Sequence, residues 1–396
     1  MFRTLIHISV KGSGKLFLWK RCFSVTNQCL FLNRSPNAAL DKGILNRFTE
    51  LKIPEDCYQA TYIWIDGTRE HIRGKDRILK GRAEAPEDLP SWLYDGSSTY
   101  QACDENSDMI LVPRTIYRHP FKSGKNDILV MCETINPDGT PSIWNQRYLL
   151  KEACDAAKIH EPLFGIEQEY VLQGTDGRPY GWPHNGFPAL QGPYYCSVGA
   201  NRAHGRDIVE SHGLACLYAG IAFSGTNAEV LPSQWEYQVG VVDGLKVADD
   251  IWVSRYILKR IAELYGVEIN FDPKPVEGNW NGSGAHTNFS TKTMREDGGL
   301  KAMEEAIAKL EKRHAQHIEV YDPKGGQDNK RRLHGVLETS RIDTFTWGIG
   351  KRAVSVRIPF PVAKSGKGYI EDRRPAANCD PYAVCNALIR TCLLEE

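Results

Sequence analysis

The chain lacks several features that define particular protein classes. None of its apolar runs approaches the roughly 18 residues that cross a membrane, and no internal repeat or low-complexity stretch is present. A net charge is also absent, because 49 Lys and Arg residues balance 49 Asp and Glu residues. Composition therefore gives no reason to expect binding to nucleic acid or to membrane. With 396 residues, 41% hydrophobic and 25% charged, the chain has the composition of a folded protein with a sizeable core.

Acidic residues are missing from the first 40 positions, which nevertheless contain basic residues and scattered Phe, Leu and Trp: Arg3, Lys11, Lys15, Lys20, Arg21 and Arg34. This composition is typical of an organelle transit peptide, whereas Lys11 and Lys15 interrupt the apolar core that a secretory signal needs. Residues 21–24, Arg-Cys-Phe-Ser, resemble a matrix processing site. We therefore expect a transit peptide at 1–30, a linker at 31–49 and a location in the mitochondrial matrix. A disordered tail on a cytoplasmic protein is the alternative.

Paired cysteines are missing as well. The eleven cysteines form no Cys-x-x-Cys pair, so we expect free thiols in a reducing compartment and neither a disulfide framework nor a zinc site. His314 and His317 have a helical spacing that could hold a metal, but no Cys or carboxylate stands directly beside them. We expect this histidine pair to lie at the end of a solvated helix.

Strand and helix patterns divide the chain into two parts. Residues 50–140 are mostly β in pattern, and they begin with an aromatic, β-branched strand at 58–65. From 145 to 396, strands alternate with longer helices, and the last helix begins with the cap pair Asp380 and Pro381. The expected helices are 145–159, 199–219, 246–265, 299–317 and 381–395. The other expected strands are 109–113, 128–134, 164–173, 221–231, 234–242, 267–272, 284–290, 352–359 and 368–373. These patterns predict a small β domain followed by a large α+β domain.

Pairs of carboxylates recur in the strand-like segments of the second part. Because side chains alternate along a strand, Glu167 and Glu169 project from one face about 7 Å apart. They repel each other unless they are solvated or share cations, so a wet outer face is the alternative. Glu229 and Glu236 lie amid apolar and aromatic residues, where burial of a bare charge is costly. Two separate surface acids beside a turn are the alternative for this pair.

Three further groups of polar residues accompany these carboxylates. His286 follows a Gly- and Asn-rich loop, which would let backbone groups approach a polar ligand closely. Glu371 and Arg373 are two residues apart and share a strand face. Guanidinium groups suit carboxylates and phosphates, although a solvated basic stripe is the alternative for the remaining arginines: Arg332, Arg352 and Arg357.

Taken together, these residues are the ligands that two divalent cations need: Glu167, Glu169, Glu229, Glu236, His286 and Glu371. Carboxylate ligands favour Mg²⁺ or Mn²⁺, and a single imidazole is compatible with Mn²⁺. Arginines beside such cations suggest a nucleoside triphosphate and an acidic co-substrate. Neither a Walker A sequence nor a kinase Gly-rich loop is present, so the phosphate chemistry must use another framework.

Two longer segments resemble the signatures of the glutamine synthetase family, most closely its animal members. They are residues 94–98 (Tyr-Asp-Gly-Ser-Ser) with 106–108 (Asn-Ser-Asp), and the segment from Lys274-Pro275 through His286 to Ser290. The resemblance runs in family order from about residue 50 to the end. It implies a β-grasp-like N-terminal domain at 50–140 and a catalytic domain at 145–396 whose curved antiparallel sheet is flanked by helices.

The activity implied by the resemblance is that of a glutamate–ammonia ligase (EC 6.3.1.2), an enzyme of ammonia assimilation and glutamine biosynthesis. ATP would phosphorylate glutamate, and ammonia would displace phosphate from the γ-glutamyl phosphate to give glutamine. Family members are rings, and the animal type resembles two stacked pentamers with active sites between subunits. A scaffold without activity and a ligase for another amine are the alternatives; the intact ligand set argues against the first.

The resemblance also implies roles for individual residues. Glu169, Glu229 and Glu236 would hold one cation, and Glu167, His286 and Glu371 the other. The catalytic residues would be Asp95, which deprotonates ammonium, Glu338, which lies on a flap over the intermediate, and Arg352, which stabilises the transferred phosphate. Contacts to glutamate and ammonium would come from Asn279, Trp280, Asn281, Gly282, Arg332, Arg352, Arg373 and Tyr195. Contacts to ATP would come from Glu236, Asn288, Phe289, Ser290, Arg352, Arg357, Tyr369 and Glu371.

Overall fold

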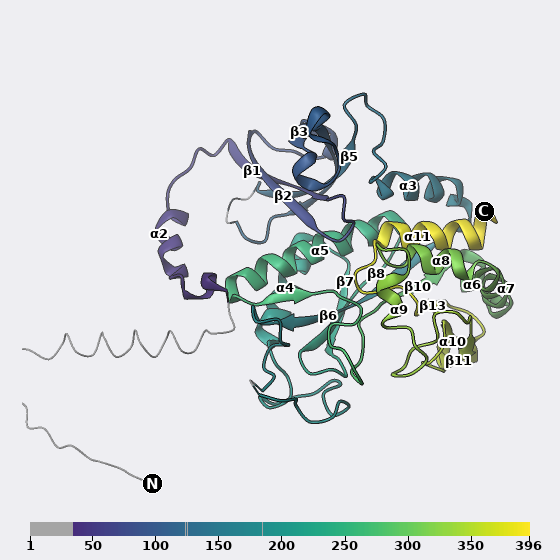
Figure 1. The fold of residues 1–396 in the computed structure, drawn as a ribbon. Coiled ribbons are helices and arrows are strands. Elements are labelled where there is room, and N and C mark those ends of the chain that lie inside the picture. The colour runs from purple at the N-terminus through teal and green to yellow at the C-terminus, as the bar shows by residue number, and fades with distance from the viewer. Residues whose placement is uncertain (1–34, 123, 125, 184) are drawn as a thin grey trace, which may run out of the picture.

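The computed structural model describes residues 35–122, 124, 126–183 and 185–396. The expected transit peptide at 1–30 lies outside the described residues, and so does the start of the expected linker. Figure 1 shows a small sheet above a larger one, with helices packed between and beside them. The α+β class that the sequence predicts is confirmed, and so is its order, with the smaller sheet first.

The smaller sheet is mixed and has the strand order β2-β1-β5-β4-β3. Its central pair, β1 and β5, is parallel, whereas the other neighbours are antiparallel. The strands are β1 (Cys57–Ile65), β2 (Ile72–Lys80), β3 (Trp92–Asp95), β4 (Asp108–Arg118) and β5 (Ile128–Ile135). The strand predicted at 58–65 is β1. Strand β2 was not predicted, because its many charged residues hide the alternation that a half-buried strand normally shows.

The larger sheet has the strand order β11-β12-β13-β10-β6-β8-β7, with β9 paired to β6. Strands β11 and β12 are parallel, and all the other pairs are antiparallel. Its members are β6 (Leu163–Gln173), β7 (Phe223–Ala228), β8 (Gln234–Val242), β9 (Glu268–Asn270), β10 (Ala285–Ser290), β11 (Trp347–Ile349), β12 (Val356–Ile358) and β13 (Ile370–Asp372). The predicted strand at 234–242 has the observed bounds, and the strand predicted at 352–359 is shorter than expected.

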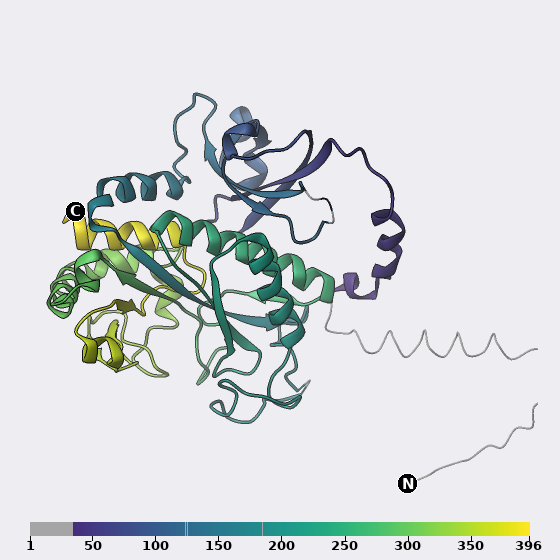
Figure 2. The ribbon, with the colours of Figure 1, turned by 180° about the vertical axis from the view of Figure 1, so that it is seen from behind.

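Helices cover one face of the larger sheet and leave the other face to loops (Figures 1 and 2). The α-helices are α2 (Asn46–Thr49), α3 (Gln146–Ala156), α4 (Arg206–Ala219), α5 (Gly244–Tyr265), α6 (Lys292–Arg295), α7 (Gly299–Lys312), α8 (His314–Val320), α9 (Gln327–Lys330), α10 (Phe360–Ser365) and α11 (Pro381–Ile389). Short 3₁₀ turns are η1 (Pro36–Ala39), η2 (Lys42–Leu45), η3 (Pro86–Asp88), η4 (Ser97–Thr99), η5 (Asp104–Asn106) and η6 (Lys158–His160), and a π-helical turn is η7 (Arg390–Leu394). None of the helices described here is long and apolar enough to cross a membrane.

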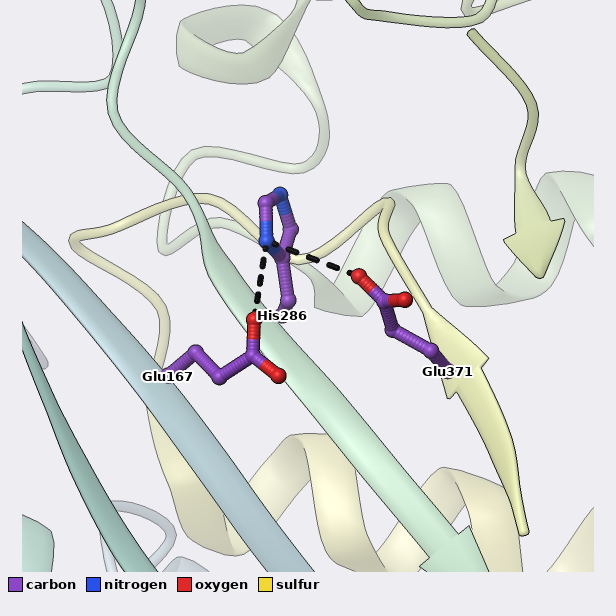
Figure 3. A group of neighbouring side chains, drawn as sticks. All are labelled: Glu167, His286 and Glu371. Atoms are coloured by element: carbon purple, nitrogen blue, oxygen red, sulfur yellow. Dashed lines mark ion pairs between the residues drawn. The ribbon is translucent and has the colours of Figure 1, made fainter. Parts of the chain in front are cut away.

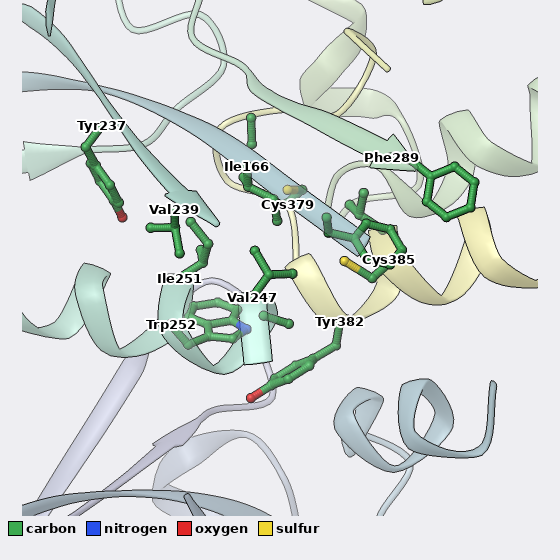
Figure 4. Packing of buried hydrophobic residues seen from close by; sticks show 14 of the residues in the cluster. Ile166, Tyr237, Val239, Val247, Ile251, Trp252, Phe289, Cys379, Tyr382 and Cys385 are labelled. Atoms are coloured by element: carbon green, nitrogen blue, oxygen red, sulfur yellow. The ribbon is translucent and has the colours of Figure 1, made fainter. Parts of the chain in front are cut away.

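Helix α5 occupies the centre of the molecule, between the two sheets. It begins where the Asp243 side chain accepts a hydrogen bond from the Lys246 amide, and it ends at Gly266, whose φ of 68° only glycine adopts readily. Its apolar face packs against the inner face of β6 and β8, as Figure 4 shows for Trp252, Ile166 and Val239. The same core cluster includes residues of β1, β4 and β5, so one face of the smaller sheet packs into the core of the larger one, while a second apolar cluster belongs to the smaller sheet alone.

Two buried aspartates join α5 to the elements around it. Asp249 accepts a two-nitrogen fork from Arg147 of α3, with both N···O distances below 3 Å, and hydrogen bonds from Thr115 of β4 and Tyr382 of α11. Asp250 accepts from the Tyr117 hydroxyl at 2.8 Å. A buried carboxylate is tolerated only when its oxygens are fully paired, and here three elements, β4, α3 and α11, supply the partners.

Four sequence expectations about helices need correction. The helix predicted at 199–219 starts at Arg206, because Gly205 has a left-handed φ of 77°. The helix predicted at 299–317 breaks at Arg313, where the backbone leaves helical geometry. The helix predicted at 381–395 changes to a π-helical turn after Ile389. The solvated position expected for the histidine pair is wrong, since His317 is only 2% exposed.

Candidate active site

Four neighbouring strands bring five of the six predicted cation ligands together on the face of the large sheet that the helices leave uncovered, and the sixth, Glu229, lies in the loop between β7 and β8. In the antiparallel register, His286 of β10 lies opposite Glu167 of β6, and Glu169 of β6 lies opposite Glu236 of β8. Strand β13 pairs with the other edge of β10 and adds Glu371. Because directly opposite residues point to the same face of a sheet, ligands distant in sequence converge without any contribution from loop geometry.

This face carries a cavity of about 390 Å³. The predicted site residues that line it are Glu167, Glu169, Tyr195, Glu229, Glu236, Asn281, Gly282, His286, Arg332, Glu338, Arg352, Arg357 and Arg373. Most residues predicted to take part in chemistry thus share one space. Several lining residues were not predicted: Asn227, Val230, Gln234, Leu337 and Thr339.

Two groups of ligand atoms are close enough to share a cation. In the first, the Nδ1 atom of His286 lies 3.5 Å from an oxygen of Glu167 and 3.8 Å from an oxygen of Glu371 (Figure 3). In the second, Glu169 and Glu236 offer oxygens within 4.8 Å of each other and of a His286 nitrogen. The resemblance suggested Glu229 for this second set. Glu229 instead accepts hydrogen bonds from the Asn227 side chain and the Val230 amide, although it lines the same cavity.

Burial and mutual repulsion disfavour negative charge in this cavity. Burial raises the pKa of Glu169, and the neighbouring Glu229 carboxylate raises it further. Burial likewise raises the pKa of Glu236, with added repulsion from Glu167, Glu169 and Glu229. Burial lowers the pKa of His286, assisted by the Arg373 guanidinium, which keeps the imidazole in the neutral form that binds metals. Crowded hard oxygen donors with one neutral imidazole fit Mg²⁺ or Mn²⁺.

Arginines enclose the other side of the cavity. Glu371 accepts hydrogen bonds from Arg357 at 2.8 Å and from Arg373 at 2.5 Å. Arg332 is only 4% exposed, and it donates to the backbone carbonyl of Arg373 at 2.9 Å. Burial lowers the pKa of Arg332 to about 10, and it remains protonated at neutral pH. Fixed guanidinium groups of this kind suit a carboxylate or a phosphate.

The Gly-rich loop before β10 lets Arg332 approach the strand. A Cβ atom at Gly284 would lie 2.4 Å from an Arg332 nitrogen, and a Cβ at Gly282 would lie 2.8 Å from the Arg332 side chain. Both distances are too short for any side chain. The backbone amide of Gly284 also donates to Glu169 at 2.8 Å. These glycines therefore allow the Arg332 side chain to approach the backbone closely, whereas the sequence predicts close approach of this backbone to a ligand.

Glu338 lies at the tip of a closed loop over the cavity, which we call the Glu338 loop (residues 333–342). The amide of Ile342 donates to the carbonyl of Leu333 at 2.9 Å at the base of this loop. Leu337 and Glu338 both have left-handed φ values, 55° and 63°. Two such residues in succession are uncommon outside glycine, and they turn the tip back on itself above the carboxylates.

Some predicted residues do not line this cavity. Asp95 is exposed at the end of β3, where the hydroxyls of Ser98 and Ser97 donate to its oxygens and lower its pKa to about 2. The Phe289 side chain packs in the core against Phe164.

Five others border the cavity or lie close to it. Trp280 stacks on Phe187 beside the cavity, and Asn279 is exposed next to it. Asn288 donates to Glu167 at 2.8 Å. Ser290 donates to the carbonyl of Gly368, which precedes Tyr369. Burial raises the pKa of Tyr369, and the nearby Glu167 carboxylate raises it further.

The residues that the sequence analysis missed have a recognisable signal. Gln234, Glu236 and Gln238 alternate along β8, so they share one face. Gln234 donates to Glu169, and Gln238 donates to Glu236. Strand alternation from the predicted ligand Glu236 would have found Gln234.

Comparisons with known proteins agree with this geometry. A family profile described as glutamine synthetase, catalytic domain, matches residues 145–394. The chain is 64% identical to "Glutamine synthetase 1, mitochondrial" of Drosophila melanogaster, over 94% of this chain and 93% of the relative. It is 55% identical to "Glutamine synthetase 2 cytoplasmic" of the same fly, over 92% and 99%. Identity is also 55% to human glutamine synthetase, over 92% and 97%.

A solved structure described as "Apo GmaS without ligand" matches with a TM-score of 0.66 over 89% of this chain and 80% of that chain, at 20% identity. It shows that the fold is shared. The fold, the cavity and the sequence matches together define an enzyme of the ligase class. The chain belongs to the glutamine synthetase family and is a glutamate–ammonia ligase of the animal type.

Proposed function

We propose that this chain ligates ammonia to L-glutamate through γ-glutamyl phosphate, with ATP as the phosphate donor. The observation that carries this proposal is the single cavity in which two carboxylate and histidine clusters face four arginines. A carboxylate is a poor acyl donor to ammonia until one of its oxygens is phosphorylated, because only then does the acyl carbon carry a good leaving group. The site needed for that step must hold several anions together, and this cavity has the charges to do so.

The family resemblance suggests a role for each side chain, and the position of each in the cavity supports that role. Arg332 and Arg373 would hold the α-carboxylate of glutamate, and Arg352 and Arg357 would hold the phosphates of ATP. Divalent cations, Mg²⁺ or Mn²⁺, held by the two clusters would neutralise the phosphate and carboxylate charges as they meet. The γ-carboxylate oxygen then attacks the γ-phosphorus, and the bond to ADP breaks. Ammonia attacks the acyl carbon, and phosphate leaves.

Asp95 and Glu338 would act on the ammonium. Asp95 is ionised at neutral pH and lies outside the cavity of its own chain. We propose that it reaches the cavity of a neighbouring subunit, within a homo-oligomer of two stacked pentameric rings. There it would hold ammonium beside Tyr195 and Glu229 and accept its proton. Glu338 would cover the intermediate and exclude water.

The chain would work in the mitochondrial matrix. Two observations support this location: the basic, acid-free composition of the first 40 residues, and the 64% identity to a relative described as mitochondrial. A cytoplasmic relative is also similar, at 55%.

The function is tested by measuring glutamine formation from glutamate, ammonium and ATP with the purified full chain and Mg²⁺. We expect glutamine and phosphate in equal amounts. Glu371→Gln should lower the rate by a factor of about 100 or more, because it removes a carboxylate that both a cation and two arginines contact. Glu304→Gln, on the exposed face of α7, is the matched control and should leave the rate unchanged.

Two results would contradict the proposal. An assembled protein that forms no glutamine would refute the reaction; if it consumed ATP with methylamine in place of ammonium, a ligase for another amine would replace it. An unchanged rate in Glu371→Gln would refute the assigned cation cluster.

A further inference from the structure

The histidine pair of α8, with His317 buried and His314 half-buried, lies behind the active site and makes a continuous set of hydrogen bonds. The alternation of side chains along strand β13 explains this position. Glu371 points toward His286 and Arg373 lines the cavity, so the alternating residues Asp372 and Arg374 face the other way, and both are fully buried. Arg374 donates to Asp372 through Nε at 2.9 Å and through Nη2 at 2.6 Å. This fork holds the rear of the strand that presents Glu371.

His314 connects this fork to the Glu338 loop. An arginine can only donate, so Arg374 Nη1, at 3.0 Å, donates to Nδ1 of His314. The imidazole proton then lies on Nε2, which donates to the carbonyl of Ile342 at 2.8 Å. Burial lowers the pKa of His314, in agreement with a neutral ring. His314 thus joins the rear of β13 to the base of the Glu338 loop.

The hydrogen bond from His314 to Ile342 lies at the base of the Glu338 loop, where it can affect the position of the whole loop. Ile342 also donates its amide to Leu333, and it thereby closes the loop whose tip carries Glu338. Leu333 follows Arg332 directly, and Arg332 donates to the carbonyls of both Arg373 and Arg374. A single imidazole therefore joins the loop, the substrate-facing arginines and the strand that carries Glu371.

His317, one turn further along α8, belongs to the same set of hydrogen bonds but not to the loop. The Tyr321 hydroxyl donates to Asp372 at 2.6 Å, so its oxygen accepts from Nδ1 of His317, also at 2.6 Å. The other ring nitrogen of His317 accepts from the Thr391 hydroxyl at 2.9 Å. His317 therefore ties β13 to the C-terminal turn and makes no hydrogen bond to residues 333–342.

We propose that His314 is a positioning residue that holds the Glu338 loop in register with β13 and so protects the acyl phosphate from water. The inference rests on the proposed function. When the contact is lost, the loop loosens. Water can then attack the acyl carbon, the bond to phosphate breaks, and glutamate and phosphate are returned without glutamine. The signature of a loosened loop is phosphate released in excess of glutamine.

The test compares His314→Phe with His317→Phe in the full, assembled protein, measuring phosphate, glutamine and melting temperature for each. Wild type should release one phosphate per glutamine. In His314→Phe the ratio should rise by about twofold or more, because the contact to Ile342 is gone. His317→Phe should lower the melting temperature yet keep the ratio at one. His314→Gln can still donate to Ile342, so it should recover much of the coupling.

Several outcomes would overturn the inference. A folded His314→Phe protein with a ratio of one would show that the contact is only structural, and equal ratios in the two Phe variants would show that the loop is not the element affected. If His314→Phe fails to fold, His314→Asn, which is too short to reach Ile342, replaces it with the same expected excess of phosphate. A wild-type protein that forms no glutamine would instead refute the proposed function.

Discussion

The carboxylates of the cavity lie closer together than is favourable in a buried site that holds no cation. Burial and three neighbouring carboxylates raise the pKa of Glu236, so its ionisation opposes folding. In the folded chain without cations, stability therefore falls as pH rises above the pKa of an unfolded glutamate, about 4.3. Repulsion between the carboxylates therefore favours cation binding and lowers the stability of the cation-free protein.

Glu236→Gln should stabilise the protein when no divalent cation is present. The amide carries no charge, so on the order of 1–2 kcal/mol should be gained near pH 8, and the gain should vanish near pH 4. The measurement is the melting temperature with EDTA across that pH range. Added Mg²⁺ should stabilise wild type more than the variant. Glu304→Gln again serves as the control, and a variant less stable than wild type at pH 8 would contradict the expectation.

At the scale of elements, helix α5 connects the larger sheet to the smaller one. Its apolar face belongs to the large sheet, and Asp249 carries bonds to β4, α3 and α11. The helix thus fixes how the smaller sheet sits on the larger one. Loss of one partner in a buried charged network is costly because the others remain unpaired.

Asp249→Ala should lower the free energy of unfolding by about 3–5 kcal/mol, because Arg147, Tyr382 and Thr115 lose their shared acceptor. Urea denaturation followed by circular dichroism measures this loss. Glu210→Ala, on the exposed side of α4, should change stability little. If the two variants denature at the same urea concentration, the shared carboxylate does not hold α5 to its neighbours.

At the scale of the whole molecule, Asp95 lies outside the cavity of its own chain, so the proposed mechanism would need residues of two subunits at each active site. Subunits with Asp95→Ala and subunits with Glu338→Ala should each be nearly inactive. When the two are expressed together, about a quarter of the interfaces should combine an intact Asp95 with an intact Glu338. Activity near a quarter of wild type is therefore expected. Assembled mixtures that stay inactive would show that the site does not use residues of two subunits.

The sequence predicts which residues line the cavity better than it predicts the buried residues that hold them in position. Strand alternation and residue chemistry are local properties, so Glu167 and Glu169 could be placed on one face from their spacing alone. The buried role of His317 could not, because its partners Tyr321 and Thr391 are brought to it by tertiary packing. The break at Arg313 has the same origin, since it redirects α8 toward β13. The charged strand β2 was missed because both helix and strand patterns fail there.

The shared core also limits how the enzyme can open and close. Residues of β1, β4 and β5 pack in the same cluster as those of β6 and β8, so the two sheets cannot swing apart as a hinge without exposing that core. Substrate entry and product departure would then depend on local loop rearrangement. The turnover rate would then depend on how often the Glu338 loop opens. Catalytic rate would be set by the motion of this loop and not by domain motion.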